Sequence, residues 1–159
     1  MIVGLGMDVV EIARIQRILE GPPARAERFL ARCFTEAERA YCEGARDRAA
    51  RYAARFAAKE AASKALGAPA GIGWHDVEVV RGEGPPGLVL RGVAAEAAAR
   101  AGAGRRLLTL THDAGVAAAT VVLEGKPPPE PRSAPSPAPL RGAKEVRGQA
   151  GQRKSGDKP

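Results

Sequence analysis

The chain has 159 residues, of which 45% are hydrophobic and 27% are charged, a composition typical of a soluble globular protein. The net charge is +7, but residues 126–159 hold eight of the 25 Lys/Arg and only three of the 18 Asp/Glu, so the basic excess says little about the rest of the chain. No stretch approaches the roughly 20 consecutive apolar residues of a membrane span, which excludes a membrane protein.

A strand followed by four helices is predicted for the first half of the chain. Residues 2–10 are rich in β-branched side chains, which favour a strand. Three local signals mark helix ends: the Gly-Pro-Pro run at 21–23, a capping box of Thr35 and Glu38, and a cap at Asp47. We therefore expect helices at 11–19, 24–32, 35–43 and 47–66, with Gly67 just beyond the last and longest one.

The second half of the chain changes to the two-residue period of strands. The expected elements are strands at 76–81 and 87–91 around a turn at 84–87, an alanine-rich helix at 93–101, and strands at 106–111 and 115–124 around a turn at 112–115. This order predicts an α+β fold in which a mainly antiparallel sheet packs against the long helix.

The last segment of the chain differs from the rest in composition. Residues 126–159 hold eight of the 13 prolines and no aromatic residue, so they cannot bury enough apolar surface to offset the entropy of ordering. We predict a folded domain at 1–125 and a disordered, basic, Pro/Gly-rich tail at 126–159. The tail keeps open a second class, a small module that contacts RNA or DNA, although scarce aromatics and a nearly neutral remainder argue against a folded nucleic-acid platform.

The cysteines and the first residues indicate the compartment. Cys33 and Cys42 fit no metal-binding spacing, and the chain has no CxxC motif. The opening apolar run is interrupted by glycines and lacks a basic leader, so we predict no secretory signal. Two reduced thiols in a cytoplasmic protein are expected, with one disulfide as the alternative.

Asp8 ends the first apolar run, GLGMDVV, where a strand should be buried. On an alternating strand it shares a face with Gly4 and Gly6, and glycines allow another backbone or a ligand to come close. The alternative is a solvated strand end, which Asp8 on its own would favour. The run lacks the third glycine of a dinucleotide-binding fingerprint, so that kind of site is not predicted.

Two further groups of polar residues are candidates. In the segment RFAAKEAASKALG, Glu60 and Lys64 are four residues apart and share a helix face, with Arg55 one turn earlier. The alternative is an exposed face with one weak ion pair, but the many alanines indicate a helix suited to burial. His112 and Asp113 fall in the predicted last turn, where simple exposure is the alternative. Because no GxSxG motif is present, a hydrolase triad is unsupported.

Asp8 and Glu60 together suggest a hard-metal site, since they can meet where the strand packs on the long helix. Mg²⁺ usually takes one or two protein carboxylates and completes its shell with water and substrate phosphates. Lys64, one turn past Glu60, can neutralise phosphate oxygens or move a proton. The pattern therefore points to phosphoryl transfer or pyrophosphate cleavage.

Two long segments, GLGMDVVEIARI and RFAAKEAASKALG, resemble the two signature motifs of the holo-(acyl-carrier-protein) synthases, which are small phosphopantetheinyl transferases. The later segment LTHDAGVAAATVV is similar to that family's closing strand pair. The resemblance covers about residues 1–124 and leaves the predicted tail outside. It implies a single-domain, phosphopantetheinyl-transferase-like fold.

The resemblance also implies an activity and its residues. The family transfers 4'-phosphopantetheine from coenzyme A to a serine of an apo acyl carrier protein with Mg²⁺, in support of fatty acid biosynthesis, with a polyketide carrier as the alternative acceptor. By match to the motifs, Asp8 and Glu60 would bind the metal and act in catalysis with Lys64. The residues implied near coenzyme A are Arg55, Lys64, Gly67, His112 and Asp113. The family forms homotrimers with active sites between subunits, so Asp8 and Glu60 of one site can come from one chain or from two.

Acyl carrier proteins are acidic, and the family docks them on its first helix. The resemblance therefore implies docking by Arg14, Arg17 and Arg25, and the fork geometry of arginine suits carboxylate contacts. The alternative is a solvated basic face balanced by neighbouring glutamates. A phosphate-binding scaffold without activity is disfavoured, because Asp8, Glu60 and Lys64 are all present.

Overall fold

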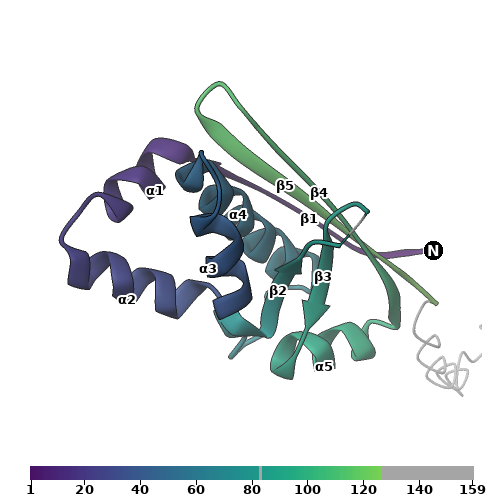
Figure 1. Ribbon diagram of the computed structural model, residues 1–159. Helices are drawn as coiled ribbons and strands as arrows, with labels where there is room; N and C mark the ends of the chain where they lie inside the picture. The colour runs from purple at the N-terminus through teal and green to yellow at the C-terminus, as the bar shows by residue number, and fades with distance from the viewer. Residues whose placement is uncertain (83, 127–159) are drawn as a thin grey trace, which may run out of the picture. The chain divides into compact units, whose positions relative to one another are not determined.

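The computed structural model describes residues 1–82 and 84–126, which form an α+β fold with two antiparallel sheets (Figure 1). The larger sheet has the strand order β1-β5-β4, and β2 pairs with β3 in the smaller sheet. In chain order the elements are β1 (Ile2–Glu11), α1 (Ile12–Leu19), α2 (Pro23–Cys33), α3 (Glu36–Glu43), α4 (Arg48–Ala65), the short 3₁₀ helix η1 (Trp74–Asp76), β2 (Val77–Val80), β3 (Gly87–Leu90), α5 (Gly92–Arg100), β4 (Ala103–Asp113) and β5 (Val116–Gly125). The predicted fold class, with antiparallel strands packed against a long helix, is confirmed.

The longest helix, α4, lies directly on one face of the larger sheet, against β1 and β5 (Figure 1). Two glycines of β1 allow this close approach. A Cβ atom on Gly6 would lie 2.0 Å from the carbonyl oxygen of Ala61, and one on Gly4 would lie 2.2 Å from that of Ala65. Any side chain at either glycine would push the helix away. The alternation of β1 then places Asp8 on this same face, beside the helix.

Small and aromatic side chains fill the core around α4. Ala53, Ala57 and Ala61 are fully buried, and their small size lets the helix pack closely on the sheet. Aromatic rings gather on another side of α4, where the ring centroids of Phe34 and Tyr52 are 4.8 Å apart. The few aromatic residues thus pack in or against the core, and the indication that the alanine-rich segment forms a buried helix is confirmed.

The predicted helix caps are confirmed. The Thr35 side chain accepts a hydrogen bond from the Glu38 amide, and the Glu38 carboxylate accepts one from the Thr35 amide, which completes the capping box. Asp47 Oδ1 accepts a hydrogen bond from the Ala50 amide at the start of α4. Gly67 follows the end of α4 with a φ of 79°.

Most predicted boundaries are wrong by one to three residues, and two of them show the reason. A helix was expected from Glu11, but β1 continues through this residue because it still pairs with Val116 of β5. A strand was expected from Asp76, but this residue ends η1, where its carboxylate accepts a hydrogen bond from the Gly73 amide. In both places a contact outside the local pattern decides the boundary.

The turn of the last hairpin is shorter than predicted, so His112 and Asp113 are strand residues. Asp113 pairs with Val116, which leaves only Ala114 and Gly115 in the turn. Their φ angles are 47° and 80°, and both are positive, as a two-residue type I′ hairpin turn requires. His112 and Asp113 therefore lie on opposite faces of the sheet.

A buried ion pair ties α4 to α3 and β2. The Lys59 and Glu38 side chains are 1% and 0% exposed, and Nζ lies 2.8 Å from Oε2. Lys59 also donates to the carbonyl oxygens of Trp74, at 2.8 Å, and of Val77, so all three ammonium protons have partners. The other oxygen of Glu38 accepts a hydrogen bond from the Val79 amide at 2.9 Å. Burial lowers the pKa of Lys59, and the charge of Glu38 opposes this effect.

Three other predictions concern the chain as a whole. In the part of the chain that the structure describes, no helix has the length and apolar content needed to cross a membrane. Cys33 and Cys42 are buried free thiols, as the expectation of reduced cysteines requires. The predicted tail lies, from residue 127 on, outside the described residues, so the domain boundary stays a prediction.

Candidate active site

Asp8 and Lys64 form an ion pair where β1 packs on α4. Lys64 Nζ lies 2.7 Å from Asp8 Oδ1 and donates a second hydrogen bond to the carbonyl oxygen of Met7 at 3.1 Å. The Asp8 side chain is only 18% exposed, whereas that of Lys64 is 51% exposed. Two of the predicted catalytic residues, 56 positions apart in the sequence, thus meet within one chain.

Glu60 lies one turn before Lys64 on α4 and acts on the same ammonium group. The hydrogen bond with Asp8 raises the pKa of Lys64, and the negative charges of Asp8 and Glu60 add to this effect. Glu60 also borders an open cavity of about 180 Å³, whose lining residues are Lys59, Glu60, Ser63, Ile72, Gly73, Trp74 and Val77. Of the three predicted catalytic residues, Glu60 therefore lies beside a space that can admit part of a ligand.

The two carboxylates suit magnesium better than a transition metal. Mg²⁺ binds oxygen ligands and usually takes only one or two from protein carboxylates. Asp8 and Glu60 supply such oxygens, and their charges act together on Lys64. Over residues 1–82 and 84–126, no three side chains of His, Cys, Asp or Glu gather as a transition-metal site would need. The donor set therefore fits the predicted cofactor.

A second cavity, of about 120 Å³, brings together two residues that were predicted to lie near coenzyme A, Arg55 and His112. Its lining residues are Tyr41, Arg51, Ala54, Arg55, Arg81, Pro86, Leu110 and His112, and we call it the arginine cavity. Among the lining residues that the structure describes, three are arginines and none is an acid. Such a set of guanidinium groups is suited to bind phosphate or carboxylate groups.

Arg55 is the buried member of the arginine cavity. Only 3% of this residue is exposed, and its guanidinium lies 4.0 Å from the centroid of the Tyr41 ring. Within the described part of the chain, its Nε atom has no hydrogen-bond partner. Buried polar atoms nearly always have a partner, so this N–H is available to a water molecule or to a polar group of a ligand.

The sequence analysis missed three residues of the arginine cavity, Tyr41, Arg51 and Arg81. Arg51 precedes Arg55 by four residues, so the shared helix face was a signal that could have found it. Tyr41 belongs to α3, and Arg81 follows β2. Neither of these two has a local pattern that points to the cavity, because only the packing of α3 and β2 beside α4 brings them there.

Three of the residues that were predicted to lie near coenzyme A, namely Lys64, Gly67 and Asp113, do not line the arginine cavity. Gly67 lies just after α4, at the Lys64 end of the helix. Asp113 Oδ1 accepts a hydrogen bond from the Ala114 amide at 2.8 Å, which stabilises the hairpin turn. Asp113 follows His112 directly in β4 but lies on the other face of the sheet, so of these two neighbours only His112 lines the cavity.

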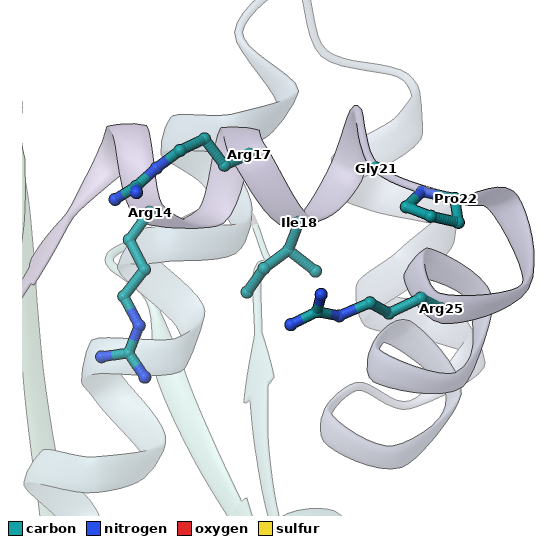
Figure 2. A pocket seen from close by; sticks show the side chains of 6 residues that line it. All are labelled: Arg14, Arg17, Ile18, Gly21, Pro22 and Arg25. Carbon is teal, nitrogen blue, oxygen red and sulfur yellow. The ribbon is translucent and has the colours of Figure 1, made fainter.

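The predicted docking arginines lie together where α1 meets α2 (Figure 2). Arg14, Arg17 and Arg25 line an open cavity of about 450 Å³, together with Ile18, Gly21 and Pro22. Figure 2 shows Ile18 between the side chains of Arg14 and Arg25. Arg17 turns back along α1, and its guanidinium lies 3.9 Å from the carboxylate of Glu11. We call this cavity and its rim the α1–α2 surface, which combines positive charge with an apolar centre.

Comparison with known proteins agrees with this arrangement. Residues 4–119 match the family described as the 4'-phosphopantetheinyl transferase superfamily. A holo-[acyl-carrier-protein] synthase of Anaeromyxobacter sp. (strain Fw109-5) is 77% identical over 126 residues, which cover 79% of this chain and 98% of the relative. The enzyme of that name from Myxococcus xanthus (strain DK1622) is 60% identical over 123 residues, covering 77% of this chain and 95% of the relative.

Solved structures of the same kind share the fold. The Bacillus anthracis holo-(acyl-carrier-protein) synthase in complex with CoA (3',5'-ADP) has a TM-score of 0.63 and 34% identity, covering 79% of this chain and 99% of that one. The Helicobacter pylori enzyme in complex with coenzyme A has a TM-score of 0.63 and 28% identity, covering 76% of this chain and 99% of that one. With sequence and fold in agreement, the chain belongs to the 4'-phosphopantetheinyl transferase superfamily and, within it, to the holo-[acyl-carrier-protein] synthases.

Proposed function

We propose that the chain transfers 4'-phosphopantetheine from coenzyme A to a serine of an apo acyl carrier protein. The observation that supports this most is the ion pair of Asp8 with Lys64, from two distant segments, with Glu60 one helical turn away at the edge of an open cavity. In the reaction a bond forms between the serine Oγ and phosphorus, and the bond from that phosphorus to the bridging pyrophosphate oxygen breaks. Adenosine 3',5'-bisphosphate leaves, and the serine proton is released.

Asp8 and Glu60 would hold Mg²⁺, with Lys64 beside the phosphates. The bound ion would supply positive charge that stabilises the leaving phosphate. The ammonium group of Lys64 offsets the same negative charge from the protein side. Asp8 is fixed by the pairing of β1 with β5, and its carboxylate is already partly shielded from water, so its position needs little reorganisation.

The arginine cavity would bind a phosphate group of coenzyme A. Arg51 and Arg55 lie on the first half of α4, and Glu60 and Lys64 lie on the second half. Because a helix rises 1.5 Å per residue, Arg55 and Glu60 are separated by about 8 Å along the axis. The unpartnered Nε of Arg55 supports a ligand at this place.

The α1–α2 surface would receive the acidic carrier protein. Reversing the charge of Arg14 or Arg25 should raise the KM for the apo carrier at least about tenfold, because close charge pairs across an interface contribute strongly to binding. The KM for coenzyme A should stay within twofold, because this surface lies apart from the arginine cavity. Steady-state kinetics with each substrate varied in turn measure both constants.

A matched control for the docking prediction is Arg100→Glu on α5, where the same charge reversal falls on another exposed helix. This variant should keep the carrier KM of the natural protein. An unchanged carrier KM in both Arg14→Glu and Arg25→Glu would remove the α1–α2 surface from the docking site.

The chain would associate with copies of itself through the face of the larger sheet that α4 does not cover. Leu5, Met7 and Val9 alternate along this face of β1, and each of them is more than half exposed. An apolar stripe of this kind on a sheet marks an interaction site. We propose the homotrimer that the family resemblance implies, with active sites between subunits.

Light scattering should give the mass of three chains, and Met7→Asp should give a single chain. A natural protein that stays monomeric at tens of micromolar would contradict the trimer.

We propose that the reaction takes place in the cytoplasm and serves fatty acid biosynthesis. The two buried free thiols support a reducing compartment. The names of the relatives support a carrier protein as the acceptor, and the family resemblance supports the fatty-acid carrier.

Mass spectrometry of an apo carrier tests the proposed function. A fatty-acid acyl carrier protein incubated with coenzyme A, Mg²⁺ and this protein should gain the mass of one phosphopantetheine on its serine. A carrier in which that serine is replaced by alanine should gain nothing. An apo carrier that stays unmodified at every Mg²⁺ concentration would contradict the proposal.

A further inference from the structure

Tyr41 contacts all three arginines of the arginine cavity. Its hydroxyl oxygen accepts hydrogen bonds from Nη1 of Arg51 and, at 3.2 Å, from Nη1 of Arg81. The guanidinium groups of Arg55 and Arg51 lie over its ring, at 4.0 Å and 5.3 Å from the centroid. One side chain of α3 therefore joins the first half of α4 to the segment that follows β2.

The contacts with Tyr41 hold together groups that repel one another. Arg51, Arg55 and Arg81 carry like charges, and no acid lines the cavity among the residues described there. A phenolic oxygen and an aromatic face are neutral partners that can hold guanidinium groups side by side. The positive field also acts on Tyr41: burial raises its pKa, but the hydrogen bond from Arg81 and the arginine charges outweigh burial and lower the pKa.

We propose that Tyr41 is a positioning residue, which holds Arg51, Arg55 and Arg81 in the arrangement that binds the 3'-phosphate of coenzyme A. The inference rests on the proposed function and goes beyond it, because it assigns to Tyr41 the positioning of the three arginines.

The lining of the cavity favours the 3'-phosphate over the other phosphates of coenzyme A. The pyrophosphate is the group that reacts, so it must reach Asp8, Glu60 and Lys64, and within one chain none of these lines the arginine cavity. The 3'-phosphate is the remaining phosphate of the cofactor. As a monoester it carries close to two negative charges at neutral pH, which suits a cluster of three guanidinium groups.

The substitution Tyr41→Phe tests this role, because it keeps the ring beneath Arg55 but removes the oxygen that Arg51 and Arg81 share. We expect the Kd and the KM of coenzyme A to rise about tenfold, as for the loss of a hydrogen bond to a charged group. Both kcat and the KM of the carrier should stay within twofold. Dephospho-coenzyme A lacks the 3'-phosphate, so its affinity should be nearly equal in the natural protein and the variant. A general loss of structure would weaken both ligands alike.

Tyr52→Phe is the matched control, because Tyr52 is the second of the two tyrosines and its hydroxyl donates to Glu43 at 2.9 Å, outside the cavity. It should leave the Kd of coenzyme A unchanged. The proposal is overturned if Tyr41→Phe keeps the natural affinity for coenzyme A, or if it weakens coenzyme A and dephospho-coenzyme A equally. Titration calorimetry measures binding without turnover, so it tests the role of Tyr41 independently of carrier modification. A failure to modify the carrier would instead overturn the proposed function.

Discussion

Replacing Asp8 with asparagine should slow phosphopantetheine transfer about 10²- to 10³-fold, although the side chain keeps its size. The change removes the negative charge that lies 2.7 Å from Lys64 and that we propose binds Mg²⁺. Glu60→Gln should have an effect of similar size, and it should also raise the Mg²⁺ concentration for half-maximal rate at least about tenfold. The mass gain of an apo carrier over time, at Mg²⁺ from micromolar to millimolar, measures both effects.

Glu96→Gln is a suitable control, because the Glu96 carboxylate is exposed on α5 and lies 3.8 Å from Arg100. Its rate should stay within twofold of the natural protein. Calorimetric titration of Mg²⁺ into the complex with coenzyme A gives a second measurement that needs no turnover, and Asp8→Asn should lose most of the binding heat. If Asp8→Asn and Glu60→Gln both keep the natural rate and the natural Mg²⁺ dependence, the metal assignment is wrong.

The residues around Asp8 could be predicted because they belong to two segments, and within each segment a short spacing places them on one face. A period of two places Gly4, Gly6 and Asp8 on one face of a strand, and a spacing of four places Glu60 and Lys64 on one face of a helix. The glycines also predict that a backbone or a ligand comes close to that strand. The structure identifies the approaching backbone as α4, which is why the two faces meet.

The arginine cavity could not be predicted in the same way, since its residues come from α3, α4, β4 and the segments after β2. The local sequence around each of these arginines, taken alone, is typical of an ordinary exposed charge. Glu38 shows a related limit. The sequence correctly predicts it as the partner of Thr35 in a capping box, but the same carboxylate reaches Lys59 on another helix. A local pattern identifies one role of a side chain and gives no sign of a second, distant partner.

Replacing Lys59 with methionine should lower the free energy of unfolding by about 3–5 kcal/mol. The change leaves the Glu38 carboxylate buried without its counter-charge and removes the donor from the carbonyl oxygens of Trp74 and Val77. Chemical denaturation at a fixed protein concentration measures the loss. Adding Glu38→Gln should recover part of it, since no charge is then buried alone, and a double-mutant cycle should give a coupling energy of about 2 kcal/mol.

A comparison with the ion pair of Arg39 and Glu27 tests whether burial or short distance causes the loss of stability expected for Lys59→Met. Its closest nitrogen and oxygen are also 2.8 Å apart, but its side chains are 30% and 60% exposed. Water can solvate either charge when the other is removed, so Arg39→Met should cost less than about 1 kcal/mol. Equal costs for Arg39→Met and Lys59→Met would mean that desolvation is not the cause. Glu38 accepts hydrogen bonds from the Thr35 amide at the start of its own helix and from the Val79 amide of β2, so it cannot turn toward water when Lys59 is lost. The larger cost should therefore fall on the buried pair.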